Sequence, residues 1–511
     1  MPMPERPPLA TVLVAVLAGA KLALHLVVNA VTPYGFHRDE FLYLAMGRHL
    51  QLWRMDFPPG IALLAEATRG VLGDSLLAIR TAPALAGVAL VVLAALLARE
   101  LGGGRWAQGL AAAAPLASPL FLRAANLFQP VVLDQLLWTA ALYALARICR
   151  SGEQRWWVAL GAAIGAGLLT KFSIGFLGVA LLPAILLSSQ RRALLTPWPW
   201  IGVTIALAIG SPSVVGQVRL GFPVLGQMAD LRASQLDRVT PTAFVLGQFL
   251  WGPITLLALA GVAALLRAER FRVFRPVGWT CVGAFVVLLL LRGKPYYLGP
   301  VYPTLCAAGA VLLEGVRPRR LGTSLRWSTV ALVVAFGIVT LPLGVPILPP
   351  SRMAAYAQAI GATPALRTNT GQMDQLPQDY ADMLGWEEQV ATVAEVYHAL
   401  PPADRARAVI VGGNYGEAGA IDFFGPRLGL PAAVSPAGSY WFFGPGQKPG
   451  EVVVTIGPSR EQLIPLFESV RAAARVVQPW AVEEERDLTV HVATNPRQTL
   501  QEIWPSLAGQ N

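Results

Sequence analysis

Acidic side chains are scarce in the first 346 residues of this 511-residue chain, and their positions are informative. This stretch contains 13 of the 30 Asp and Glu residues, and five of them fall within residues 32–80: Asp39, Glu40, Asp56, Glu66 and Asp74. The pair Asp39-Glu40 could supply a general base or a metal ligand, with Asp56 as a further carboxylate nearby. An equally good interpretation is helix capping, because acids in a first helical turn complement the helix dipole.

A second set of candidate residues lies within or beside apolar runs. Asp134 falls near the end of one such run, where a carboxylate is costly and usually functional, although it could instead pair with Arg123. Lysine is rare, and Lys171 and Lys294 each end or follow an apolar run, the latter within Arg292-Gly293-Lys294-Pro295-Tyr296-Tyr297. These cations could neutralise a phosphate group, or simply extend to the membrane surface as long side chains do.

These residues belong to an unusually apolar chain. Hydrophobic residues make up 54% and charged residues 14%, and the mean hydropathy is +0.52, whereas a soluble domain carries about 25% charged residues. A single water-soluble globule, a disordered chain and a disulfide-built protein are therefore excluded. Eleven runs are long and apolar enough to predict membrane helices, at residues 9–31, 80–98, 107–124, 131–148, 156–172, 174–188, 198–215, 242–266, 277–291, 297–314 and 327–346.

The basic excess of the chain is confined to its apolar part. Residues 1–346 contain 29 of the 40 Lys and Arg residues, whereas in residues 347–511 acids outnumber bases by 17 to 11. This distribution argues for membrane loops and against a nucleic-acid-binding domain, and it favours a cytoplasmic N-terminus. An odd number of spans then places residues 32–80 and 347–511 outside. The apolar residues of Phe41–Trp53 predict a helix along the membrane surface, with Arg48 and Arg54 at lipid head groups.

Residues 347–511 are expected to form a separate extracytoplasmic α/β domain. Apolar runs predict strands at 408–411, 452–456 and 488–492, and helical periodicity predicts helices over 373–399 and 459–474. The segment Gly412–Glu417 fits a plain strand-to-helix turn better than an anion-binding site. The aromatic stretch Ser439–Gly446 could stack on a sugar or pack against the membrane.

Five motifs in this order resemble those of a known family. They are Asp39-Glu40, Asp56-Phe57-Pro58-Pro59, Asp134, Leu169-Thr170-Lys171, and Lys294-Pro295-Tyr296-Tyr297 followed by Pro300 and Pro303. Together they resemble the bacterial dolichyl-phosphate-mannose–protein mannosyltransferase-like membrane glycosyltransferases, which include relatives of the lipid A aminoarabinose transferase. The resemblance covers about residues 30–315. It implies a polytopic helical membrane protein with the glycosyltransferase C fold over residues 1–346, in which the loop 32–80 is catalytic.

The resemblance also implies an activity and its partners. A polyprenyl-phosphate sugar would be the donor, and a hydroxyl of a protein, glycolipid or polysaccharide the acceptor, at the non-cytoplasmic face of a bacterial inner membrane. Phosphate leaves readily, so the reaction needs a base and cations. Asp39 is the first choice for the base and Glu40 the second, while Asp56 would orient the acceptor or share a divalent metal with Asp39. The residues expected to bind the donor phosphate, with Asp134 supporting them, are Lys171, Arg292, Lys294, Tyr296 and Tyr297.

The sequence departs from the family pattern at one position, and it is also compatible with one other function. Phe57 stands where many members of the family have His or Lys, so a cation or metal ligand is missing and no cofactor is certain. A multispan transporter or lipid flippase would share the span number and the charges near the membrane. Transporters tend to show paired half-repeats, and no internal repeat is found.

Overall fold

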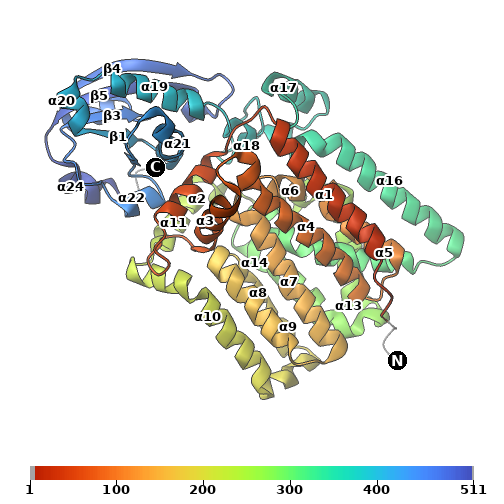
Figure 1. The fold of residues 1–511 in the computed structure, drawn as a ribbon. Helices are drawn as coiled ribbons and strands as arrows, with labels where there is room; N and C mark the ends of the chain where they lie inside the picture. The colour runs from red at the N-terminus through yellow and green to blue at the C-terminus, as the bar shows by residue number, and fades with distance from the viewer. Residues whose placement is uncertain (1–5, 509–511) are drawn as a thin grey trace. The chain divides into compact units, whose positions relative to one another are not determined.

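The computed structural model describes residues 6–508, which form two compact units (Figure 1). The helical unit consists of the chain up to Val31, Leu77–Gly216 and Met228–Ile347. The α/β unit consists of Thr32–Leu76, Gln217–Gln227 and the chain from Leu348. The loop that carries Asp39 and Asp56 therefore groups with the C-terminal segment, as does a short connection around residue 220.

The helical unit is built from long apolar helices joined by short turns. In lipid, a helix satisfies every backbone hydrogen-bonding group within the segment, so a continuous apolar run of this length is stable there as a helix. Its helices are α1 (Thr11–Val31), α4 (Leu76–Glu100), α5 (Arg105–Ala117), α6 (Pro119–Ala124), α7 (Pro130–Ser151), α8 (Trp156–Thr170), α9 (Ile174–Leu186), α10 (Pro197–Arg219), α12 (Pro241–Gly247), α13 (Pro253–Arg267), α14 (Arg275–Leu290), α15 (Tyr302–Glu314) and α16 (Arg319–Gly344). The helix α11 (Pro223–Ser234) joins the two units.

All eleven apolar runs expected from the sequence are helical, but fewer are long enough to span a membrane. Within residues 6–508, seven helices pass by length and composition, and nine if two bent pairs each count as one span. Of the other two runs, one is the 15-residue helix α8, and the other breaks between α5 and α6 at Ser118. The multi-pass helical architecture is thus confirmed, with seven to nine spans that meet the criteria in place of eleven.

Glycines allow neighbouring helices of this unit to approach backbone to backbone. A Cβ atom added at Gly261 on α13 would lie 1.9 Å from the carbonyl oxygen of Leu305 on α15, and one at Gly309 would lie 2.1 Å from that of Leu257. Small residues are the usual means of close helix packing in membranes. The three cysteines, Cys149, Cys281 and Cys306, are buried and unbridged.

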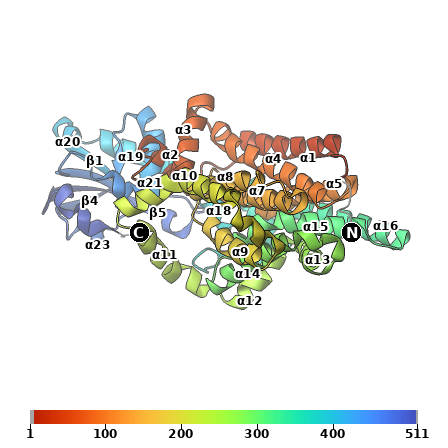
Figure 2. The same ribbon diagram turned by 90° about the horizontal axis from the view of Figure 1, so that it is seen from below.

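The α/β unit contains a five-stranded mixed sheet of order β2-β1-β3-β5-β4. The strands are β1 (Ala408–Gly412), β2 (Ala433–Val434), β3 (Val452–Ile456), β4 (Phe467–Val477) and β5 (Asp487–Pro496). The pairs β1–β2 and β1–β3 are parallel, whereas β3–β5 and β4–β5 are antiparallel. The helices are α2 (Arg38–Arg48), α3 (Gly60–Leu72), α17 (Pro350–Ala359), α18 (Gln378–Ala381), α19 (Trp386–His398), α20 (Pro402–Arg407), α21 (Tyr415–Phe424), α22 (Ser439–Phe443), α23 (Arg460–Leu463) and α24 (Leu500–Ile503). In Figures 1 and 2, α19 and α21 lie beside this sheet.

Three strands of this unit were expected, and one expected helix is wrong. The runs at 408–411, 452–456 and 488–492 are confirmed as β1, β3 and part of β5. The helix expected over 459–474 is only the four residues of α23, and the rest is the edge strand β4, which pairs with β5 through a bulge near Ala472. The alanine-rich run favours a helix locally, but pairing with β5 outweighs that preference. The helix expected over 373–399 is divided into α18 and α19, with Gly385 between them in the left-handed region (φ 95°).

The helix expected to lie along the membrane surface packs within the α/β unit. On α2, Phe41, Leu44 and Met46 are almost completely buried. A Cβ atom added at Gly419 on α21 would lie 2.6 Å from the Phe41 Cβ atom, so the two helices are in close contact. Arg48, expected at lipid head groups, instead donates to the backbone carbonyl of Asp422 at 2.5 Å. The apolar face of α2 is covered by protein, whereas Trp53, at the end of the expected helix, is 43% exposed. The sequence pattern alone does not distinguish burial against protein from burial in lipid.

Candidate active site

The acid pair at residues 39 and 40 begins α2, and its two carboxylates have different surroundings. His37 is the N-cap residue: its Nδ1 atom accepts from the Asp39 backbone N–H at 3.1 Å, and its own N–H donates to the Glu40 carboxylate at 2.7 Å. Glu40 is fully buried, and in this capping box it satisfies a backbone donor that the helix itself leaves unpaired. The capping interpretation therefore applies to Glu40, with His37, and not Asp39, at the N-cap position.

The Asp39 carboxylate is held by a tyrosine from the C-terminal segment. The Tyr415 hydroxyl, at the start of α21, donates to the Asp39 Oδ1 atom at 2.9 Å. Burial and the neighbouring Asp39 charge raise the pKa of Tyr415 well above its ordinary value, so its hydroxyl stays protonated and remains a donor. Asn414 caps α21 and accepts from the N–H groups of Gly416 and Glu417, which confirms the expected plain strand-to-helix turn.

Asp56 is buried where three segments of the α/β unit meet. Its carboxylate accepts from the Ser439 hydroxyl at 2.8 Å and from the Gln227 amide at 3.1 Å, and its backbone carbonyl accepts from the Gln217 amide at 2.5 Å. Only 2% of Asp56 is exposed. Burial raises the pKa of its carboxyl group, and the hydrogen bonds from Ser439 and Gln227 oppose that effect.

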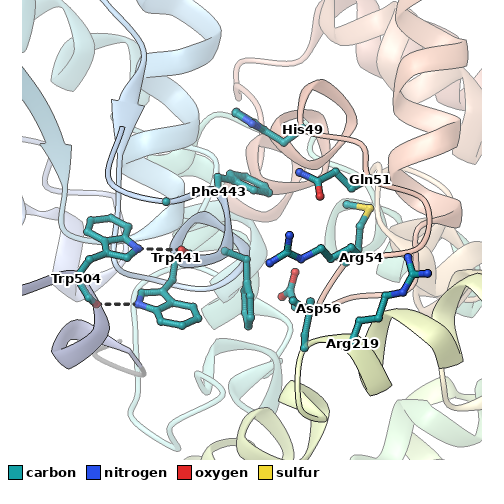
Figure 3. A pocket seen from close by; sticks show the side chains of 12 residues that line it. His49, Gln51, Arg54, Asp56, Arg219, Trp441, Phe443 and Trp504 are labelled. Atoms are coloured by element: carbon teal, nitrogen blue, oxygen red, sulfur yellow. Dashed lines mark hydrogen bonds between the residues drawn. The ribbon is translucent and has the colours of Figure 1, made fainter. Parts of the chain in front are cut away.

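A cavity of about 440 Å³ lies beside Asp56, entirely within the α/β unit (Figure 3). Arginine, carboxylate and aromatic side chains line it together, which suits a polar ligand with a flat face. Its lining residues are His49, Gln51, Arg54, Met55, Asp56, Arg219, Leu220, Trp441, Phe442, Phe443, Gly444 and Trp504. Four of them come from the aromatic stretch for which the sequence left sugar stacking or membrane packing open.

One described group of side chains has the composition of a metal site. The ligand atoms of His37, Asp379 and Asp382 all lie within 4.8 Å of one another, with His37 Nε2 at 3.9 Å and 3.7 Å from the two carboxylates. A metal on neutral His37 Nε2 would require a proton on Nδ1. That proton is incompatible with Nδ1 accepting the Asp39 N–H bond that caps α2. The group therefore does not fit a metal while the cap is intact, and neither Asp39 nor Asp56 belongs to it.

In the helical unit, the residues proposed to bind phosphate form an aromatic and cationic cluster. The Lys171 Nζ atom lies 5.3 Å from the centre of the Tyr297 ring, and the Lys294 Nζ atom lies 6.0 Å from that of Tyr296. The centres of the two tyrosine rings are 4.7 Å apart. Two lysines and two tyrosines are thus brought together from the residue after α8 and from the 3₁₀ turn Pro295–Val301, with its N-cap Lys294, before α15, although the two segments are more than 120 residues apart in sequence.

Asp134 and Arg292 have different relations to this cluster. Asp134, 5% exposed, accepts from the Ser173 hydroxyl at 2.7 Å and interacts electrostatically with Lys171. Arg292 is half-exposed, and its guanidinium lies 3.6 Å from the carboxylate of Asp237. Its backbone is in the left-handed region (φ 55°), where a non-glycine residue is strained. Asp134 therefore adjoins the lysine–tyrosine cluster, whereas Arg292 has an acidic partner of its own.

Comparisons with known proteins agree with the family that the sequence motifs resemble. Residues 56–215 match the model of the dolichyl-phosphate-mannose-protein mannosyltransferase family. The structure of ArnT from Cupriavidus metallidurans bound to undecaprenyl phosphate is similar, with a TM-score of 0.63 and 17% identity, over 94% of this chain and 97% of that chain. The chain has the glycosyltransferase C fold.

Two further structures show the same fold. ArnT from Cupriavidus metallidurans in the apo state matches with a TM-score of 0.61 and 18% identity, over 98% of this chain and 99% of that chain. The archaeal oligosaccharyltransferase AglB from Archaeoglobus fulgidus, in complex with an inhibitory peptide and a dolichol-phosphate, matches with a TM-score of 0.51 and 11% identity, over 81% of this chain and 63% of that chain. No curated protein sequence matches the chain. The resemblance and fold expected from the sequence are confirmed, and the matched family agrees with the expected class of enzyme, a glycosyltransferase.

Proposed function

We propose that the chain transfers a sugar from a polyprenyl-phosphate donor to an acceptor hydroxyl on the non-cytoplasmic face of a bacterial inner membrane. The observation that carries this proposal is the fold match along 94% of the chain to a protein bound to undecaprenyl phosphate. A mannosyltransferase family match and the fold of an oligosaccharyltransferase bound to dolichol-phosphate support it. These comparisons favour a transferase over a transporter or flippase, for which the described residues offer no specific support.

In the proposed reaction, Asp39 accepts the proton of the acceptor hydroxyl. The freed oxygen attacks the anomeric carbon of the donor sugar, and the bond between that carbon and the phosphate oxygen breaks. The polyprenyl phosphate leaves with the electron pair, so its charge must be neutralised. Lys171 and Lys294, with the hydroxyls of Tyr296 and Tyr297, are the proposed ligands of that phosphate. Arg292 would contribute only after leaving Asp237.

A single displacement predicts that the configuration at the anomeric carbon inverts. Asp39 is assigned as the base ahead of Glu40, because Glu40 is fully buried and occupied with the cap of α2. Asp56 is assigned to orienting the acceptor. NMR of the isolated product reads the anomeric configuration directly, and retention would contradict a mechanism with one base and one displacement.

The test of this assignment is sugar transfer by Asp39→Asn in membranes. Asparagine keeps an oxygen that can accept from Tyr415 but cannot take a proton, so the rate should fall about 10²–10⁴-fold with little loss of folded protein. Glu40→Gln is the matched variant, because glutamine can still complete the capping box. Wild-type transfer by a folded Asp39→Asn protein would exclude Asp39 as the base, and a comparable loss in Glu40→Gln alone would assign that role to Glu40.

Removal of divalent metal is a separate test. Asp39 and Asp56 are candidate metal ligands, but Phe57 stands where many family members have a cation or metal ligand, and His37 is engaged in capping α2. We expect enzyme washed with EDTA to keep its transfer activity. Loss of activity that returns with Mg²⁺ or Mn²⁺, but not with Ca²⁺, would establish a catalytic metal and revive the pair Asp39 and Asp56 as its ligands.

A further inference from the structure

The cavity beside Asp56 combines three kinds of side chain that together recognise a charged sugar. Arg54 and Arg219 supply two guanidinium groups, Asp56 supplies one carboxylate, and the stretch from Trp441 to Phe443 supplies aromatic rings. Its volume of about 440 Å³ lies in the range of small-molecule sites, about 300–1,000 Å³. A monosaccharide with one substituent fits this size.

The aromatic wall of the cavity is rigidly held. The Trp441 indole donates to the Trp504 carbonyl at 3.0 Å, and the Trp504 indole donates to the Trp441 carbonyl at 2.9 Å (Figure 3). His49 stacks on Phe443, with ring centres 4.3 Å apart and planes within 13°. Ser439, at the start of the same short helix, bonds to Asp56. The rings are therefore placed in advance of any ligand, which reduces the entropy that binding would cost.

The two arginines give the cavity its charge. Within residues 6–508, neither guanidinium forms an ion pair, and Arg219 makes only a long hydrogen bond, 3.5 Å, to the Trp53 carbonyl. Figure 3 shows Arg54 and Asp56 reaching into the same space. Burial lowers the pKa of His49, which favours its neutral form. The two arginines and Asp56 therefore leave the lining with an excess of one positive charge. Exposed arginines alone are common, but here both line one cavity with a stacking surface, and planar guanidinium groups match phosphate and carboxylate oxygens.

We propose that this cavity is the acceptor subsite, and that it takes a sugar unit bearing a phosphate or a carboxylate group. This inference rests on the proposed transferase function. The rings would stack on the apolar face of the sugar, Arg54 and Arg219 would bind the anionic substituent, and Asp56 would accept a hydrogen bond from a sugar hydroxyl. The donor phosphate does not need these cations, because it has a proposed set of ligands in the helical unit.

The test measures binding of three small probes to the full-length protein in detergent by titration calorimetry or saturation-transfer NMR. The probes are glucose, glucose 6-phosphate and glucuronate. We expect the anionic probes to bind at least about tenfold more tightly than glucose. Tighter binding of glucose 6-phosphate would identify a phosphorylated acceptor, and tighter binding of glucuronate would identify a uronic acid. Equal binding of all three probes, or no saturable binding of any, would overturn the proposal.

Variants separate the cavity from general surface charge. Arg54→Ala combined with Arg219→Ala should remove the advantage of the anionic probes and leave glucose binding unchanged. Arg460→Ala combined with Arg497→Ala removes two exposed arginines of the same unit that do not line the cavity, and should behave as wild type. Phe443→Ala should weaken all three probes. Unchanged selectivity in the first double variant would overturn the proposal.

Failure of this inference can be distinguished from failure of the proposed function. Binding is measured without a donor, so Asp39→Asn should bind the probes as wild type does, even though its rate of sugar transfer is strongly reduced. Selective binding by a wild-type protein that transfers no sugar would retain the anionic-sugar site and reject the transferase. Transfer to neutral acceptors, without selectivity for the anionic probes, would retain the transferase and reject this subsite.

Discussion

Asp56 is the residue whose environment predicts a pH dependence. Burial raises the pKa of its carboxyl group more than its hydrogen bonds lower it. If Asp56 must be ionised to orient the acceptor, transfer should decline on the acidic side at a higher pH than an exposed aspartate would give. The measurement is kcat/KM across pH values of about 4–8. Asp56→Asn should show lower activity and no such acidic limb; a limb that persists in this variant would belong to another group.

The same shift determines the effect of Asp56 on stability. The folded protein holds the Asp56 proton more tightly than the unfolded chain does. The protonated Asp56 carboxyl group therefore stabilises the folded state fully at pH values below the ordinary carboxyl pKa. This stabilisation is lost as the pH rises through the raised pKa of Asp56 in the folded protein. We therefore expect Asp56→Asn to melt at or above the temperature of wild type at neutral pH, while its transfer activity falls. A clearly lower melting temperature would mean that the ionised carboxylate stabilises the fold.

The sequence identifies the candidate acids but not their partners. Asp39 and Asp56 stand out because acids are scarce around them. Their hydrogen-bonding partners Tyr415 and Ser439 lie 376 and 383 residues further along the chain. Such contacts leave no periodicity or spacing in a single sequence. For the same reason, the sequence predicts Arg54 at lipid head groups, whereas the structure places it in a cavity with residues from two distant segments.

At the scale of elements, the close contact between α13 and α15 depends on glycine. A side chain at position 261 would have to displace the Leu305 carbonyl, because its Cβ atom would lie only 1.9 Å away. Gly261→Val should therefore destabilise the helical unit by about 1–3 kcal/mol, the usual cost of overpacking. Thermal unfolding in detergent measures it. Gly178→Val, on a helix where an added Cβ atom meets nothing within 4 Å, is the matched control; equal melting of both variants would contradict this packing.

Elements were predictable from the sequence where one local signal dominates. Apolar runs identified helices throughout the helical unit because lipid and protein interior both select the same residues. The sequence predicts a helix where the edge strand β4 lies because the alanines at 472–474 favour a helix locally, whereas pairing with β5 determines the observed form. The position of α2 could not be deduced either, since an apolar helix face packs equally well against α21 or against lipid.

At the scale of the whole molecule, the charge distribution predicts which side of the membrane each segment occupies. Bases concentrate in loops expected inside, and the segment from residue 347 is acidic. The three native cysteines are buried, so the wild-type protein should give little background with a maleimide that cannot cross membranes. Glu468→Cys, at an exposed position of β4, should be labelled in spheroplasts of the host cell.

Ser151→Cys provides the opposite prediction in the same experiment. Ser151 is exposed at the end of α7, in a loop expected inside, so it should be labelled only after the membrane is permeabilised. The proposed mechanism needs Asp39 and Asp56 on the same side as the C-terminal segment, because all of them belong to the α/β unit. If Ser151→Cys is labelled in intact spheroplasts and Glu468→Cys is protected, the topology is the reverse of the one predicted. The donor sugar would then have to be presented on the cytoplasmic face, contrary to the proposed function.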